Sequence, residues 1–205
     1  TLGLSLGDTA IYLAPTDEIA AALKAIPKKY FVLGPSEFYT NQNTTWNLYP
    51  NLTKYTSTQR ANFNDVSGRP FVVSRFAETY LLAAEAAMQM GDNAEAADLI
   101  NVLKLRAAFR VGLSTADINA RYDAIKVTPA DITLDFILDE RTRELAGESV
   151  RWPDLAVRGK LVERAKAHNP DVTGIQAHHV LRPIPQGQLD AISNPDPESY
   201  QNPGY

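Results

Sequence analysis

Residues 136–158, FILDERTRELAGESVRWPDLAVR, carry the most information about the fold of this chain. The stretch begins as an amphipathic helix with closely spaced acidic and basic side chains, and Gly147 is its expected end. An Arg-Trp-Pro-Asp sequence follows, and Pro153 predicts the first turn of another helix, where proline is favoured. Two successive helices joined by a short turn are therefore expected here.

The charged side chains of the first helix could act as catalytic carboxylates or form ion pairs. Asp139 precedes Arg143 by four residues and Arg141 precedes Glu144 by three, which are the spacings of neighbours on one helix face. A carboxylate that donates a proton needs a raised pKa, whereas nearby arginines lower it. The pattern therefore predicts structural ion pairs and no catalytic residue.

A helix pair is expected upstream. Residues 71–90 contain no Pro or Gly, Gly91 predicts a helix end, and Asp92 with Glu95 is the spacing of a capping box. The expected antiparallel pair with a very short turn resembles one unit of a tetratricopeptide repeat. One unit cannot bury its own apolar face, so further repeats are expected beside it.

The rest of the chain is less regular. Short helices are predicted over 17–25 and 115–125, a longer one over 129–146, and another from Pro153 to Asn169. Residues 171–205 form a proline-rich tail that we expect to wrap over the helices. The sequence thus predicts a mainly α fold, with an irregular aromatic- and amide-rich region over 1–70 and a helical region over 71–205.

Composition excludes several classes of function. The 205 residues carry a net charge of −4, which does not suit a nucleic-acid partner, and no cysteine is present for disulfides or thiolate metal sites. Adjacent His178 and His179 would point to opposite sides of a strand, so we expect no shared metal ion and no cofactor. No apolar run approaches the roughly 18 residues of a membrane-spanning helix.

Five segments, in order, resemble the C-terminal part of the SusD/RagB family. They are YPNLTKY (49–55), GRPFVVSRFAETYLLAAEAAMQMGD (68–92), AADLINVLKLRA (96–107), TLDFILDERTRELAGESVRWPDLAVRGKL (133–161) and HHVLRPIPQGQLDAISNPDPESYQNPGY (178–205). The resemblance implies a non-enzymatic lipoprotein on the outer-membrane surface of Bacteroidetes. It also implies a SusC-like TonB-dependent transporter as partner and an oligosaccharide or peptide as ligand. By the same resemblance, the lipid-anchoring cysteine and most of the helical scaffold would precede Thr1.

Ligand contacts are expected in the aromatic and amide-rich segment 37–65. Sugars stack their C–H faces on Trp and Tyr rings and hydrogen-bond to side-chain amides. The candidate ligand-binding residues are Tyr39, Asn41, Trp46 and Tyr49. Alternatively, these rings anchor the segment to the helices. Trp152 is open to the same two interpretations, and for it we favour packing.

Two functions follow from these observations. The first is capture of glycans or other nutrient oligomers at the cell surface, without chemistry, for delivery to the transporter. The second is an interaction scaffold, in which the helix pair and tail dock the transporter and the ligand is held by another part of a longer protein. A glycan hydrolase is the weakest hypothesis, because no convincing carboxylate pair is present.

Overall fold

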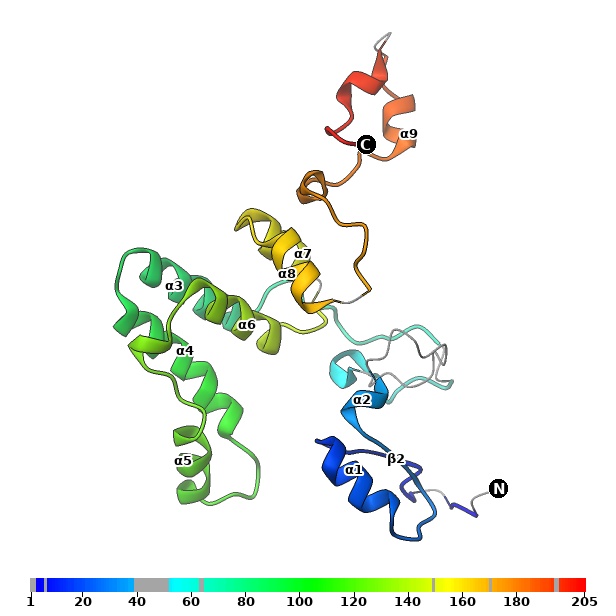
Figure 1. Cartoon of the computed structure of the whole chain (residues 1–205), viewed down its shortest axis with the longest axis vertical. Helices are drawn as coiled ribbons and strands as arrows, with labels where there is room; N and C mark the ends of the chain where they lie inside the picture. Colours follow the sequence, from blue (N-terminus) through cyan, green and yellow to red (C-terminus); the bar gives the residue numbers. More distant parts are fainter. Residues whose placement is uncertain are drawn as a thin grey trace. The chain divides into compact units, whose positions relative to one another are not determined.

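The computed structural model describes residues 3–5, 7–38, 52–62, 65–148, 150–169, 171–193 and 196–205 (Figure 1). The chain divides into two compact units, Thr1–Thr56 and Ser57–Tyr205. Regular structure in the described part is mainly helical, with one two-stranded sheet, which confirms a mainly α fold. None of the described helices is long and apolar enough to cross a membrane.

The N-terminal unit contains a small β-α-β motif. Strands β1 (Ile11–Leu13) and β2 (Phe31–Leu33) pair in parallel, and α1 (Asp17–Lys24) connects them. A parallel pair requires such a crossover, because both strands run in the same direction. Thr16 caps α1 by accepting a hydrogen bond from the Ile19 amide at 3.3 Å, so the helix predicted over 17–25 is confirmed.

Close packing at the end of β2 depends on Gly34. A Cβ atom there would lie 2.3 Å from Asp17 Oδ1 and 3.0 Å from the Ala20 side chain. The next helix, α2 (Pro35–Phe38), is held by Glu37, which accepts a hydrogen bond from the Gly34 amide at 2.7 Å. Farther along, η1 is a single 3₁₀ turn (Thr53–Tyr55). The buried core of this unit is small: Ala14, Ala20 and Val32.

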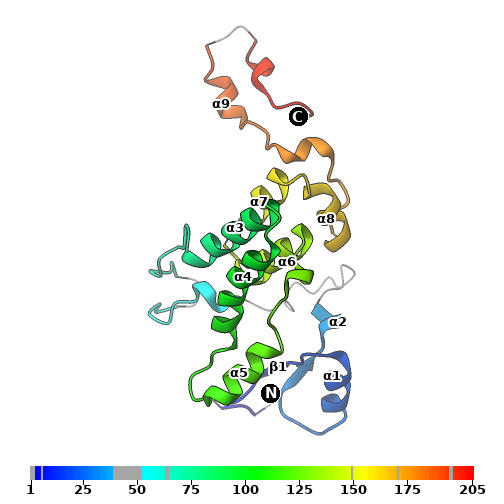
Figure 2. The same cartoon turned by 90° about the vertical axis from the view of Figure 1, so that its left-hand side faces the viewer.

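The C-terminal unit begins with the expected helix pair. Helices α3 (Phe76–Gln89) and α4 (Asn93–Ala108) lie side by side in Figures 1 and 2. Gly91 adopts φ +83°, and the Asp92 carboxylate accepts a hydrogen bond from the Glu95 amide at 3.0 Å, so the predicted turn is confirmed. Four buried alanines let the helices approach closely: Ala84, Ala87, Ala96 and Ala97. The resemblance of the pair to a tetratricopeptide repeat stays a prediction.

The helix predicted from Pro129 starts later than expected. Pro129 begins the 3₁₀ turn η2 (Pro129–Asp131), and α6 (Leu134–Glu144) begins after Thr133, whose hydroxyl accepts a hydrogen bond from the Phe136 amide at 3.1 Å. The prediction chose the wrong cap because Thr128-Pro129 and Thr133 are both suitable starts. Upstream, α5 (Thr115–Asp123) lies where a short helix was predicted.

The region after Gly147 contains two helices where one was predicted. They are α7 (Arg151–Val157) and α8 (Leu161–His168). Gly159, between them, adopts φ +66°, a left-handed conformation that ends a helix. Leu138, Leu155, Leu161 and Ile175 form the buried cluster beneath α6, α7 and α8.

The tail only partly follows the expectation that it wraps over the helices. The 3₁₀ turn η3 (Ala177–Val180) contacts α7 and α8, whereas α9 (Gln186–Asp190) and the 3₁₀ turn η4 (Pro197–Tyr200) contact each other. The Gln201 side chain closes this second part, because it accepts from the Ile184 amide at 2.8 Å and donates to the Ile184 carbonyl at 3.0 Å.

Candidate ligand-binding site

The predicted ligand-binding residues Tyr39, Asn41, Trp46 and Tyr49 all lie outside the described residues. Their role in binding stays a prediction. The described part of the chain offers a different candidate, which includes the Arg-Trp-Pro-Asp turn of the most informative stretch.

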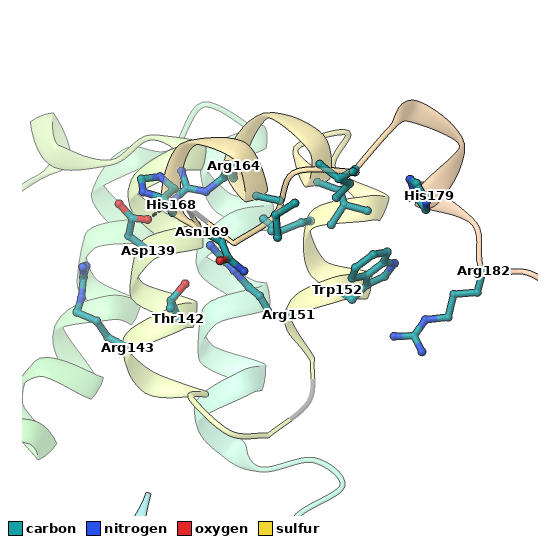
Figure 3. A pocket seen from close by; sticks show the side chains of 16 residues that line it. Asp139, Thr142, Arg143, Arg151, Trp152, Arg164, His168, Asn169, His179 and Arg182 are labelled. Carbon is teal, nitrogen blue, oxygen red and sulfur yellow. Dashed lines mark hydrogen bonds and ion pairs between the residues drawn. The ribbon is translucent and has the colours of Figure 1, made fainter. Parts of the chain in front are cut away.

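A cavity of about 960 Å³ lies among α6, α7, α8 and the segment that leads through η3 (Figure 3). This volume is near the upper end of the roughly 300–1,000 Å³ typical of small-molecule sites. Its polar lining residues are Asp139, Thr142, Arg143, Arg151, Arg164, His168, Asn169, His179 and Arg182. Its apolar lining comes from Trp152, Leu155, Leu161, Ala165, Val172, Gly174 and Ile175. Aromatic, aliphatic and hydrogen-bonding groups therefore surround one space.

Trp152 belongs both to the core and to the cavity wall. Its indole packs against the buried cluster of Leu138, Leu155, Leu161 and Ile175, so the prediction that it packs is confirmed. The Arg182 guanidinium carbon lies 5.5 Å from the centroid of the ring, within cation–π range. Figure 3 shows Arg182 extending toward the indole at one end of the cavity, with Asp139 and His168 at the other.

Two of the arginines that line the cavity are paired with carboxylates. Arg164 donates to Asp135 Oδ1 at 3.0 Å and also to Asp139. Arg143 lies 2.7 Å from Glu140 Oε2, one turn earlier on the same helix. These carboxylates offset the positive charge at this end of the cavity.

Arg151 and Arg182 differ from the other two. Neither forms an ion pair with any residue of the described ranges, and Arg151 donates instead to the Leu138 carbonyl at 2.9 Å. Burial lowers the pKa of Arg151, and the nearby charge of Arg164 lowers it further. The guanidinium remains charged at neutral pH. Arg182 therefore places a positive charge beside the indole, and Arg151 adds a second positive charge on the part of the wall near Asn169.

Comparison with known proteins gives a family. A model of the SusD family matches residues 28–205. The chain belongs to the SusD family. It is also similar to "SusD-like protein P38" of Formosa agariphila, with 37% identity over 92 residues. That alignment covers 45% of this chain and 18% of the relative, so the chain spans less than a fifth of that protein. No solved structure matches the chain.

SusD-family members are binding proteins without catalytic activity, and they reside on the outer-membrane surface. The acidic and basic side chains of α6 form structural ion pairs, as predicted. Two of these side chains, Asp139 and Arg141, have different partners from those that the sequence spacing predicted. Asp139 pairs with Arg164 instead of Arg143, and Arg141 pairs with Asp154 instead of Glu144. Sequence spacing along one helix missed these partners because they belong to other helices.

The histidine pair also differs from the prediction. His178 and His179 lie in the turn η3 rather than a strand, so their ring centroids are 4.1 Å apart instead of on opposite sides. His179 Nδ1 accepts a hydrogen bond from the Gln176 amide at 2.8 Å, and Tyr205 packs edge-on against both rings. Among the residues described, no group of three or more His, Asp or Glu side chains is arranged to hold a metal ion.

Proposed function

We propose that this chain is the C-terminal part of a surface protein that captures oligosaccharides and passes them, unaltered, to a SusC-like TonB-dependent transporter. Family membership supports a binding role, and the cavity bordered by Trp152 is the single observation that supports a saccharide as ligand. In the proposed full-length protein, a lipid anchor outside this chain holds the molecule at the outer membrane.

The cavity wall has the two kinds of group that a sugar requires. The Trp152 ring provides a flat apolar surface for the C–H face of a pyranose. Thr142 and Asn169 provide a hydroxyl and an amide, which can donate to and accept from sugar hydroxyls. Apolar walls with a few polar groups are typical of small-molecule sites.

The segment containing Tyr39, Asn41, Trp46 and Tyr49 is a second proposed contact region. Its rings and amides are of the same chemical kind as the groups of the cavity. We treat the two regions as separate candidates, each with its own substitution in the experiment below.

The helix pair supports the second candidate function, an interaction scaffold. Large apolar side chains are exposed on α3, on α4 and just after α4. They are Phe76, Leu82, Val102, Leu105 and Phe109. Exposed apolar surface of this kind is typical of protein–protein contacts and of repeat units that stack on neighbours. In this alternative, the chain docks the transporter and another part of the protein holds the ligand.

Calorimetric titration of a panel of neutral and acidic oligosaccharides into the full chain separates the two functions. We expect at least one oligosaccharide to bind. Trp152→Ala should weaken the affinity for that oligosaccharide on the order of tenfold, near the upper end of the roughly 0.5–1.5 kcal/mol of an aromatic contact. Trp152→Phe, which preserves packing, should weaken it less.

Two further variants complete the experiment. Phe109→Ala, an exposed aromatic outside the cavity lining, serves as the control and should leave affinity unchanged. Trp46→Ala tests the loop region independently. If no oligosaccharide binds the chain while a transporter does, the scaffold function is correct. Release of shortened sugars during incubation would instead show a hydrolase.

A further inference from the structure

The cavity carries positive charge that carboxylates of the described residues compensate only in part. We propose that it selects saccharides bearing oxyanions, either carboxylates or sulfate esters, whose charges pair with Arg151 and Arg182 while a sugar ring lies against Trp152. This inference rests on the proposed function and specifies its ligand class.

The charges along the cavity wall do not balance locally. Four arginines line it, and Asp139 is the single carboxylate in the same lining. Asp139 is already occupied by Arg164. Arg143 is matched by Glu140, which lies outside the lining. Within the described residues, Arg151 and Arg182 form no ion pair, and the charges of Asp154 and Asp139 near Arg151 do not offset its burial and the charge of Arg164.

Arg151 is positioned to bind an anion. The side chain is half-buried at the start of α7, and its Nη1 is oriented by the Leu138 carbonyl at 2.9 Å. A guanidinium has five N–H groups, so the others remain available for a ligand. Burial already lowers the pKa of Arg151, which means that its charge lacks solvation. An incoming oxyanion would restore that lost stabilisation.

Arg182 is held by the indole rather than by a carboxylate. Its guanidinium carbon is 5.5 Å from the Trp152 centroid, and the residue is exposed. A cation–π contact orients the planar guanidinium without using its hydrogen-bond donors. Planar guanidinium groups bind carboxylates and similar oxyanions through two parallel hydrogen bonds, which gives specificity for charge and shape.

The two arginines lie on different sides of the aromatic ring along the cavity wall, because Figure 3 shows the Arg151 side chain directed from α7 toward Asn169 and away from Arg182. Arg151 and Trp152 are consecutive at the start of α7, and Figure 3 shows Arg182 reaching toward the indole from the segment after η3. An acidic sugar therefore finds a stacking surface beside its charge partners. A neutral sugar would bury the same arginines without compensating their charge, which is unfavourable.

The test compares ligands that share their sugar rings and differ in whether these carry a charged acidic group. Tetragalacturonate carries carboxylates, and its methyl ester has the same sugar rings without them. A sulfated tetrasaccharide from carrageenan and its desulfated form make the matching sulfate pair. Titrated into the full chain at low ionic strength, the acid of at least one pair should bind ten-fold or more tightly than its neutral counterpart. The pair that shows this preference identifies the oxyanion.

Substitutions locate the charge recognition. Arg182→Gln and Arg151→Gln should each reduce the preference for the acidic ligand about ten-fold. Arg143→Gln removes a guanidinium from the same wall that already has a carboxylate partner, so it should leave the preference unchanged. Arg182 is exposed, so its variant remains informative even if Arg151→Gln fails to fold.

The outcomes distinguish this inference from the proposed function. Neutral oligosaccharides that bind as tightly as their acidic counterparts would overturn the inference and leave the proposed capture function intact. A preference for acids that Arg143→Gln weakens as much as Arg182→Gln would also overturn it, because general positive charge would then be responsible. No binding of any oligosaccharide would overturn both.

Discussion

Arg141 is the most deeply buried charged residue of the stretch 136–158, with 2% of its surface exposed. Its Nε and Nη2 donate to the two carboxylate oxygens of Asp154 at 2.8 and 2.6 Å. Glu78 Oε1 lies 3.6 Å from Nη2. A buried guanidinium is tolerated only with such compensation, because isolated charges are strongly disfavoured in a protein interior. The Arg-Trp-Pro-Asp sequence at the start of α7 therefore supplies the counterion for Arg141 of α6 as well as the cavity indole.

Removing that counterion should destabilise the protein strongly. Asp154→Ala leaves Arg141 buried without its main partner, and we expect it to lower the free energy of unfolding by about 3–5 kcal/mol. Urea denaturation followed by circular dichroism measures the change.

The matched control is Asp135→Ala. Asp135 is about half-exposed, and its partner Arg164 keeps Asp139. The expected loss is below about 1 kcal/mol, because Asp135 is partly solvated and buried Arg164 retains its second carboxylate. Equal losses for the two variants would show that burial does not decide the value of these pairs.

At the scale of elements, local signals in the sequence predicted where most helices begin and end. Asp92 caps α4 as expected, and Thr16 caps α1 at the predicted start of that helix, because a cap depends on residues three positions away. The sequence did not predict that Gly159 separates α7 from α8. Gly159 ends a helix because the chain adopts positive φ there, and the residue type alone does not show that.

The candidate site could be predicted only in part. The sequence identified Trp152 as a packed residue with a possible binding role. Arg182 lies thirty residues farther along, and only the folding of η3 against α7 and α8 brings it to the indole. Likewise, the partners of Asp139 and Arg141 lie on α8 and α7. Such pairings depend on tertiary packing, which spacing along one helix does not encode.

The β-α-β element of the N-terminal unit should respond to acid through Glu37. Its carboxylate accepts from the Gly34 amide at 2.7 Å and pairs with Lys24 Nζ at 2.6 Å. The Gly34 hydrogen bond and Lys24 lower the pKa of Glu37 below its usual value of 4.5. A lowered folded-state pKa means that this stabilisation is complete above the unfolded value and is lost as pH falls through the folded value.

The Gly34 amide reports this transition directly. Its proton and nitrogen chemical shifts, followed by NMR between pH 7 and 2, should titrate with a midpoint below 4.5. In Glu37→Gln the same signal should lose that transition. A midpoint at or above 4.5 in the unmodified protein would contradict the assignment.

Across the molecule, buried or half-buried ion pairs connect segments that are far apart in the sequence of the C-terminal unit. Arg75, before α3, donates to Glu144 Oε1 at 2.6 Å and to Glu148 Oε1 at 2.9 Å. Arg158, after α7, donates to Glu85 on α3, 73 residues away, with an Nε–Oε1 distance of 2.6 Å. These pairs join the helix pair to the helices that form the cavity wall, so the stability of the wall depends on α3.

That dependence is testable through Glu85. The hydrogen bonds that Arg158 donates to Glu85 raise the pKa of Arg158 against the effect of burial, so the pair favours the charged form of the arginine. Glu85→Gln removes the nearer of the two carboxylates that pair with the largely buried Arg158, and the remaining one, Asp154, lies on α7 itself. Helices α7 and α8 should then separate from α3 more readily. Hydrogen exchange followed by mass spectrometry should show about ten-fold or faster exchange in α7 and α8, with smaller changes in α4.

Glu163→Gln, which removes an exposed carboxylate of α8 paired with Lys160, should leave these rates unchanged. Uniform acceleration in all helices would mean that the unit opens as one cooperative body, and unchanged rates in α7 and α8 would mean that the pair does not hold the cavity wall in place.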